Sequence, residues 1–285
     1  MIVAARRSTA ARRKRSARPP LSGIRVVSLA QNVPGPLALS RLVAEGATAV
    51  KIEPPAGDPM PGFSEPWYRE MHRRVMVARI DLKSPEGRKR LAALLAQADL
   101  LLTSQRPSAL GRLGITARRL ARHHPALRWL NIVGDIAEPE RPGHDLTYQA
   151  QAGLIGHELP RTLLADVMGA ERAVSAALLL LRRTPPCSAA VGLKDAVVTA
   201  ALPRVFGLTR PHGVLGGALA AYGVYETRDG WVAIAALEPH FRSRLYEALN
   251  LSDGDDLTAV MRTRTARQWE RWAARHDLPI ARVVD

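Results

Sequence analysis

The chain has 285 residues, of which 47% are hydrophobic, and it carries a formal net charge of +15. This length and composition suit a globular protein with one large or two ordinary domains, and they exclude a disordered chain. The longest apolar run, residues 173–181, is far shorter than the roughly 20 residues that cross a bilayer, so we expect no membrane partner. The single cysteine, Cys187, excludes an internal disulfide and fits a reducing compartment, so we expect a cytoplasmic location.

The positive charge is concentrated at the start of the sequence. Residues 1–20 contain seven basic side chains and no acidic one, which leaves a charge of +8 for the rest. These residues lack a sustained apolar period, so we expect a disordered basic tail. We do not expect a nucleic acid as partner, because the remaining arginines are scattered along predicted helices and aromatic residues make up only 5% of the chain.

Strand and helix patterns alternate from residue 21 onward. Short apolar runs predict strands at 24–29, 49–52, 75–80, 100–103 and 127–133, with helices at 37–44, 84–97 and 116–124. Ser84 fits a helix N-cap, since Pro85 follows it at the first helical position. The alternation predicts an α/β fold with a doubly wound, mainly parallel sheet, whose ligands bind at the carboxyl ends of the strands.

The second half of the chain has a different pattern. It shows a long helix at 167–183, an apolar stretch at 193–206, a glycine-rich connection at 213–217, and helices at about 239–250 and 266–276. Residues 222–226 and 231–235 alternate around Arg228-Asp229-Gly230, which predicts a hairpin. We therefore divide the chain into a tail at 1–20, an α/β domain at 21–183, and a linker with a smaller α+β domain at 184–285.

Several nucleotide and metal motifs are absent from the sequence. No GxGxxG follows the first predicted strand and no GxxxxGK[ST] occurs, so neither a nicotinamide nor a nucleoside triphosphate role is supported. His123, His124 and His157 lack ligand spacing to carboxylates, so no metal is expected.

A series of short motifs occurs in a fixed order along the chain. They are Leu21-Ser22-Gly23-Ile24-Arg25, Lys51-Ile52-Glu53-Pro54-Pro55, Asp81-Leu82-Lys83-Ser84-Pro85, Arg106-Pro107 and Asp229-Gly230-Trp231. In this number and order they resemble the class III CoA-transferase family, which includes the alpha-methylacyl-CoA racemases. The resemblance covers about residues 21–285. It implies a two-domain α/β fold, an interlocked homodimer and an acyl-CoA thioester substrate, with coenzyme A as part of the substrate and no permanently bound cofactor.

The resemblance also implies residues that bind coenzyme A. Leu82 and Lys83 would flank its adenine, and Arg106 would face its phosphates, to which a guanidinium offers a planar pair of donors. Gly143 and Tyr148, on either side of His144, are further candidates for CoA binding. For Lys83 an exposed position before a helix, and for Arg106 an ordinary surface loop, remain open alternatives.

The catalytic candidates are Asp166, His144 and Glu238. In the transferases of the family the aspartate that matches Asp166 is a nucleophile, and in the racemases it works with a histidine to exchange the proton alpha to the thioester carbonyl. Such an exchange needs one protonated and one unprotonated group, which a His/Asp pair supplies, so His144 favours the racemase reaction. Glu238 is implied as a supporting acid.

Structural roles for the same three residues remain open. His144 fits a capping or loop histidine with Asp145 as the actual cap, and Asp166 fits the N-cap of the long helix that follows it. Glu238 precedes Pro239 and fits the start of the next helix.

The chain departs from the family pattern near both catalytic segments. Met168-Gly169-Ala170-Glu171 replaces a glycine-rich run after the aspartate, and residues 134–140 replace a glycine-rich segment before His144. The sequence also stops at Asp285, where family members normally run on. The leading hypothesis is a 2-methylacyl-CoA racemase-like enzyme. The alternatives are a CoA-transferase that moves CoA between carboxylic acids through Asp166, a shortened and catalytically weak CoA-binding paralogue, and a nucleic-acid-binding protein that uses the arginine-rich tail.

Overall fold

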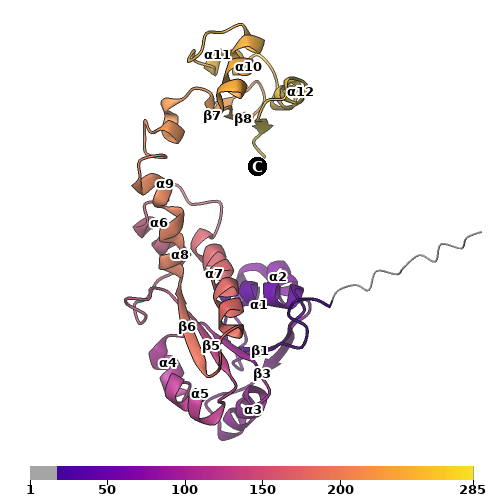
Figure 1. The fold of residues 1–285 in the computed structure, drawn as a ribbon, viewed down its shortest axis with the longest axis vertical. Coiled ribbons are helices and arrows are strands. Elements are labelled where there is room, and N and C mark those ends of the chain that lie inside the picture. The colour runs from indigo at the N-terminus through magenta and orange to yellow at the C-terminus, as the bar shows by residue number, and fades with distance from the viewer. Residues whose placement is uncertain (1–17, 285) are drawn as a thin grey trace, which may run out of the picture. The chain divides into compact units, whose positions relative to one another are not determined.

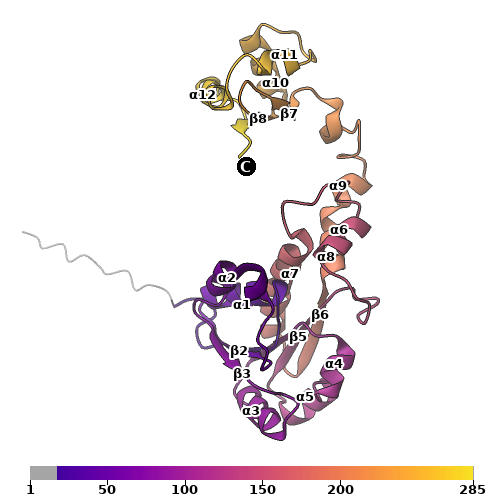
Figure 2. The same cartoon turned by 180° about the vertical axis from the view of Figure 1, so that it is seen from behind.

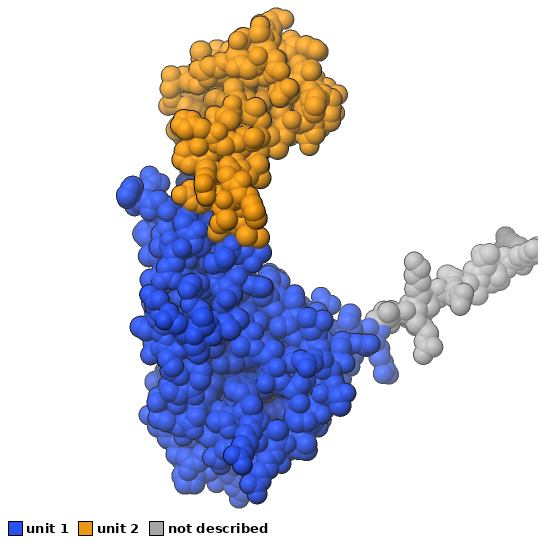
Figure 3. All heavy atoms as spheres, turned by 60° about the vertical axis from the view of Figure 1, so that its left-hand side comes forward, with its two compact units in different colours: residues 1–199 blue, residues 200–285 orange. Residues whose placement is uncertain are grey.

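The computed structural model describes residues 18–284, and the predicted tail at 1–20 therefore falls almost entirely outside the described residues. The chain divides into two compact units, residues 1–199 and residues 200–285 (Figure 3). The division falls after Thr199 and not after Arg183, because the strand at Cys187–Gly192 pairs within the sheet of the first unit.

A parallel sheet of six strands forms the centre of the first unit (Figure 1). Its strands are β1 (Arg25–Ser28), β2 (Thr48–Glu53), β3 (Met76–Arg79), β4 (Leu100–Thr103), β5 (Arg128–Val133) and β6 (Cys187–Gly192). The spatial order is β3-β2-β1-β4-β5-β6, and every neighbouring pair is parallel. The strand order reverses between β1 and β4, which is where doubly wound sheets bind ligands.

Helices cover both faces of this sheet. They are α1 (Pro34–Ala44), α2 (Met60–Met71), α3 (Pro85–Leu95), α4 (Pro107–Arg112), α5 (Ala117–His123), α6 (Asp145–Gln151), α7 (Leu164–Leu181) and α8 (Leu193–Ala200). The helices α1, α2 and α7 lie on one face, and α3, α4 and α5 lie on the other (Figures 1 and 2). Successive residues of a strand point to opposite faces of the sheet and so belong to two different hydrophobic cores. Leu100 and Leu102 pack with side chains of α1 and α7, whereas Leu101 packs with side chains of α3, α4 and α5.

The second unit is a small α+β structure. Its antiparallel sheet has the order β7-β8-β9, with β7 (Tyr222–Glu226), β8 (Trp231–Ala235) and β9 (Ile280–Arg282). The other elements of this unit are α9 (Leu202–Val205), a π-helical turn η1 (Val214–Ala218), α10 (Pro239–Leu249), α11 (Thr258–Met261) and α12 (Ala266–His276). The fully buried Trp269 anchors the core, and its indole N–H donates to the Met261 carbonyl at 2.7 Å.

The predicted fold class, a doubly wound parallel sheet with a smaller α+β domain, is confirmed. Ser84 caps α3 as predicted, since its Oγ accepts a hydrogen bond from the Gly87 N–H at 2.9 Å. The N-cap position predicted for Asp166 is wrong: α7 begins at Leu164, so Asp166 lies inside its first turn. None of the helices within residues 18–284 combines the length and the hydropathy that a bilayer-spanning helix needs.

Candidate active site

A cavity of about 250 Å³ lies in the first unit, at the carboxyl ends of β1, β4 and β5. Its walls come from the segments after these strands, from the loop before α6, and from the first turn of α7. The position at the β1/β4 reversal is the one expected of a ligand site in a doubly wound sheet. Its lining residues are Gln31, Asn32, Pro34, Ser104, Gln105, Arg106, Ile132, Val133, Gly134, Pro139, Arg141, Pro142, Gly143, His144, Tyr148, Asp166 and Leu193.

Asp166 contributes an unusual carboxyl group to this cavity. Burial raises its pKa from the ordinary 3.8 to about 7, and the nearby negative charge of Asp145 acts in the same direction. The Asp145 side chain fixes the backbone of this residue, since the Asp166 backbone N–H donates to Asp145 Oδ1 at 3.0 Å. Near neutral pH the Asp166 side chain therefore populates both protonation states, which suits it to proton transfer.

The buried carboxylate of Asp145 is the part of this site that sequence reasoning missed. Asp145 is the first residue of α6, and its Oδ2 accepts from the Gln149 side chain at 2.6 Å. Gln149 is held in turn by the Thr162 carbonyl, to which its Nε2 donates at 3.1 Å. In sequence, an acid at the start of a helix reads only as a favourable helix-dipole residue, so its effect on Asp166 is visible only in three dimensions.

His144 occupies the N-cap position of α6 and lies on the cavity wall. Its backbone N–H donates to Thr147 Oγ1 at 3.0 Å, and that hydroxyl donates to the His144 carbonyl at 2.7 Å. These two bonds fix the start of α6. The capping interpretation and the catalytic interpretation of His144 are therefore compatible, because the cap uses its backbone and leaves its imidazole on the cavity wall.

The Tyr148 side chain explains why glycine is needed at two positions of the cavity wall. A Cβ atom placed on Gly134 would lie 2.1 Å from the Tyr148 hydroxyl oxygen, and one placed on Gly143 would lie 2.5 Å from the same atom. Both glycines thus let the buried tyrosine ring lie directly against the backbone. Burial raises the pKa of Tyr148, with the charge of Asp166 as a second cause.

The structure brings together five of the predicted site residues. Arg106, at the N-cap of α4, lines the cavity together with Gly143, His144, Tyr148 and Asp166.

The other three predicted residues do not line this cavity. Leu82 packs partly against the core beneath α3, Lys83 is exposed in the turn before that helix, and Glu238 is the N-cap residue of α10 in the second unit. The roles assigned to all eight residues stay predictions. Sequence reasoning also missed Gln31, Asn32, Ser104 and Gln105, the polar residues of the β1 and β4 loops.

A buried charge network supports one wall of the cavity. Lys51 is fully buried, its Nζ lies 3.0 Å from Glu53 Oε1, and it also donates to Asp58. Asp58 accepts from the Asn32 N–H at 3.2 Å, and Asn32 has a left-handed φ of 62°. The network therefore reaches from strand β2 to a residue of the cavity lining.

His72 completes this network as a neutral side chain. Burial lowers its pKa, and the positive charge of Lys51 lowers it further. With Nε2 unprotonated, that atom accepts from Lys51 Nζ at 3.0 Å, while Nδ1 donates to the Tyr68 carbonyl at 2.6 Å. Tyr68 donates its hydroxyl to Glu53 at 2.8 Å, so both carboxylates of the network have protein donors.

Within residues 18–284 no cluster of three or more His, Cys, Asp or Glu side chains is placed to hold a metal ion.

The profile of CoA-transferase family III matches residues 21–285. The chain belongs to this family. The resemblance seen in the short sequence motifs is thereby confirmed over nearly all of the described residues.

The relatives of this family III member include both transferases and a racemase. It is 26% identical over 272 residues to a probable fatty acyl-CoA transferase of Mycobacterium tuberculosis, which covers 80% of this chain and 68% of the relative. It is 29% identical over 266 residues to the alpha-methylacyl-CoA racemase of Mus musculus, and the match covers 85% of this chain and 67% of the racemase. It is 30% identical over 263 residues to the alpha subunit of a succinyl-CoA–L-malate CoA-transferase of Chloroflexus aurantiacus, covering 81% and 61%.

Solved structures agree with the family III fold. A crystal structure of a hypothetical protein from Mycobacterium tuberculosis matches 94% of this chain and 84% of that chain with a TM-score of 0.81 at 22% identity. A CaiB/BaiF family protein from Brucella suis matches 94% and 85% with a TM-score of 0.77 at 20% identity. At this level of identity the likeness concerns the fold.

The raised pKa of Asp166 predicts how this family III member responds to pH. The Asp166 carboxyl group has a pKa of about 7 in the folded state and about 3.8 in the unfolded state. Between about pH 4 and pH 7 the folded state therefore holds one more proton than the unfolded state, so the free energy of unfolding falls as the pH rises through this range. The full shift corresponds to about 4 kcal/mol, and solvent screening at the partly exposed side chain reduces this to about half. We therefore expect Asp166→Asn to raise the free energy of unfolding near pH 8 by about 2 kcal/mol and to leave it nearly unchanged near pH 3. Urea unfolding across this pH range measures the difference, and an equal gain at both ends would contradict it.

Proposed function

We propose that this protein acts on acyl-CoA thioesters and exchanges the proton alpha to the thioester carbonyl, with Asp166 and His144 as the two bases. The observation that carries the proposal is the Asp166 carboxyl group, which has a pKa of about 7 and shares a cavity with His144. A general base works best when its pKa lies near the operating pH, and an ordinary aspartate is far from that condition.

The proposed reaction has two proton transfers. The Asp166 carboxylate takes the alpha proton from one face of the carbon, and the electrons of the broken C–H bond form the enolate of the thioester. Protonated His144 then donates a proton to the opposite face, and the enolate electrons form the new C–H bond. Asp166 is left protonated and His144 neutral, which is the starting state for the reverse reaction.

The remaining candidates have binding roles in this proposal. Arg106 lines the cavity and offers its guanidinium to the phosphates of CoA, while Leu82 and Lys83 contact the adenine. Gly143 and Tyr148 form the wall beside His144. Glu238 keeps the role of a supporting acid that the family resemblance implies. The homodimer and the cytoplasmic location expected from the sequence complete the proposal.

A second candidate function is transfer of CoA between carboxylic acids. It is favoured by the names of several relatives, among them a cinnamoyl-CoA:phenyllactate CoA-transferase of Clostridium sporogenes, which is 33% identical over 152 residues. Asp166 would then attack the thioester carbonyl as a nucleophile, and His144 would not be required.

A substitution of His144 therefore distinguishes epimerisation from CoA transfer. We expect His144→Ala to slow epimerisation of a 2-methylacyl-CoA by roughly 100-fold or more, because one of the two faces loses its proton donor. Any transfer activity should change much less. Epimerisation is followed by chiral chromatography, and transfer by the appearance of a new acyl-CoA in mass spectrometry.

The matched control for this experiment is His123→Ala. His123 is exposed on α5 and does not line the cavity, so its loss should leave both rates unchanged. Full epimerisation by His144→Ala would overturn the racemase-like proposal. CoA binding without either activity in the wild type would instead identify a catalytically weak paralogue.

A further inference from the structure

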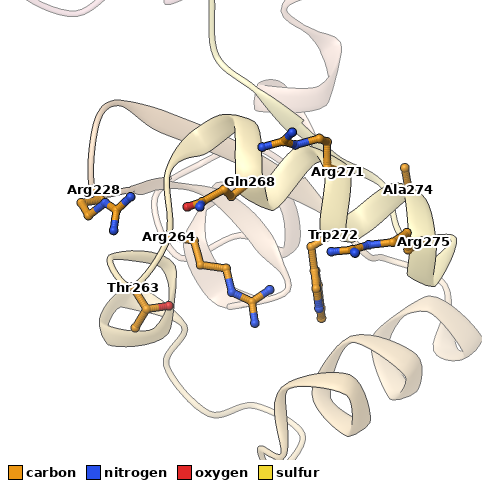
Figure 4. A pocket seen from close by; sticks show the side chains of 8 residues that line it. All are labelled: Arg228, Thr263, Arg264, Gln268, Arg271, Trp272, Ala274 and Arg275. Carbon is orange, nitrogen blue, oxygen red and sulfur yellow. The ribbon is translucent and has the colours of Figure 1, made fainter.

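A second pocket lies wholly within the second unit, and four of its eight lining residues are arginines (Figure 4). Its volume is about 810 Å³, within the range of small-molecule sites. Its lining residues are Arg228, Thr263, Arg264, Gln268, Arg271, Trp272, Ala274 and Arg275. None of these residues belongs to the cavity around Asp166.

The spacing of these residues along the chain explains why they converge. Arg264, Gln268, Arg271 and Arg275 follow one another at intervals of four, three and four residues, so they form one stripe along α12 and the residue before its cap. Arg228 faces this stripe from the turn between β7 and β8 (Figure 4). The pocket thus carries guanidinium groups on two sides.

A buried tryptophan fixes part of this arrangement. The Arg264 guanidinium lies 4.5 Å from the centre of the Trp269 ring and 5.5 Å from that of Trp272, which are cation–π distances. Figure 4 shows the side chains of Arg264 and Arg275 on either side of Trp272. The two cation–π contacts orient Arg264 without neutralising its charge.

The acidic groups near the pocket are already engaged elsewhere. Glu226 pairs with Arg262 at 2.7 Å, Glu270 with Arg282 at 3.6 Å, and Asp277 with Arg244 at 2.7 Å. Asp229, next to Arg228 in sequence, accepts from the Ala266 N–H at 2.8 Å.

The four arginines of the pocket consequently have no carboxylate partner among the described residues. Like charges spaced four residues apart destabilise a helix, so Arg271 and Arg275 on α12 are a cost to the free protein. The whole second unit holds eleven arginines and ten acidic residues, so its formal charge is only +1. The positive pocket therefore results from segregation of charge within the unit and not from a general excess.

We propose that this pocket binds a small anion that carries two or more phosphate groups. A single phosphate has too little charge for four guanidinium groups, whereas adjacent phosphates offer the oxygen pairs that guanidinium forks bind. The same chemistry occurs in inorganic polyphosphates and in nucleotides. This site is separate from the acyl-CoA reaction proposed above and does not depend on it.

Titration calorimetry of the full chain with sodium tripolyphosphate and with ATP, at low and fixed ionic strength, tests this site. The pocket variant is Arg271→Gln/Arg275→Gln, since both residues are exposed and make no side-chain hydrogen bond within residues 18–284 that the fold would lose. The control is Arg118→Gln/Arg267→Gln, which removes the same charge from exposed positions outside the pocket. We expect the pocket variant to bind roughly tenfold or more weakly and the control to change less than about twofold.

The two ligands distinguish the source of the phosphates. If both bind and both weaken in the pocket variant, the phosphates alone are recognised; if only ATP does so, the occupant is a nucleotide. Either result supports the site. The proposal fails if neither ligand binds the wild type, or if pocket and control variants lose affinity equally, since that would reflect net charge alone.

Discussion

We expect Asp166→Asn to reduce deuterium incorporation at the alpha carbon of a 2-methylacyl-CoA by roughly 10³-fold in heavy water. The amide keeps the shape of the protonated carboxyl group but cannot take a proton from the substrate. Because a pKa of about 7 means that the wild-type protein already accommodates the neutral carboxyl group at neutral pH, we expect the neutral amide to be accommodated as well. Mass spectrometry of the recovered thioester measures the incorporation.

The matched control for this variant is Glu171→Gln. Glu171 lies on the same helix, α7, but it is exposed and pairs with Arg41 at 3.2 Å on the surface. Its loss should change neither the exchange rate nor the stability appreciably. If Asp166→Asn retained more than about a tenth of the wild-type exchange, another group would have to be the base.

The second large effect concerns Lys51. We expect Lys51→Met to lower the free energy of unfolding by about 3–5 kcal/mol, because it leaves the carboxylates of Glu53 and Asp58 buried without their shared cation. Methionine fills a similar volume, so the loss would reflect charge and not an empty space. Urea unfolding at neutral pH measures it.

Two further variants make this result specific. Lys83→Met removes a lysine from an exposed position and should change stability by less than about 0.5 kcal/mol. In Lys51→Met/Asp58→Asn one of the stranded charges is also removed, so part of the lost stability should return. A destabilisation below about 1 kcal/mol in the single variant would show that water already reaches the network.

The local patterns of the sequence predict most of the sheet. Strand β4 and the hairpin strands β7 and β8 lie at the predicted residues, because an apolar run or an alternation is a property of neighbours in the chain. Strand β6 was not predicted. It is made of small residues, Cys187 to Gly192, and is held by its pairing with β5, whose residues lie more than fifty positions earlier.

Helix α2 shows a different limit of sequence reasoning. It contains Pro61, Gly62 and Pro66, residues that normally mark loops, and its backbone departs from helical geometry at Ser64. The helix forms because its ends, Met60 and Met71, are buried in the main core. Tertiary packing thus overrides the local preference, which a pattern of single residues cannot reveal.

The candidate site was predictable only in part. Asp166, His144, Gly143, Tyr148 and Arg106 were found through family motifs, and the structure places them around one cavity.

Two charged groups behind the cavity lining, Asp145 and Lys51, were not found in the sequence as parts of this site. Asp145 reads as a helix-start acid and Lys51 as a surface charge, since charged residues are seldom fully buried. Their effects arise from contacts between distant segments, such as Asp145 with the backbone of Asp166 and Lys51 with His72.

Some parts of the cavity wall are packed against the hydrophobic core, whereas others are exposed on the surface. Asp145 and Asp166 sit at the starts of α6 and α7, and α7 packs into the main core, whereas the segment 140–142 is exposed. Substitutions in this loop can reshape the cavity without altering the burial that raises the pKa of Asp166. Under the proposed function, substitutions that alter substrate preference would therefore leave the proton chemistry of Asp166 unchanged, and the two properties would evolve separately.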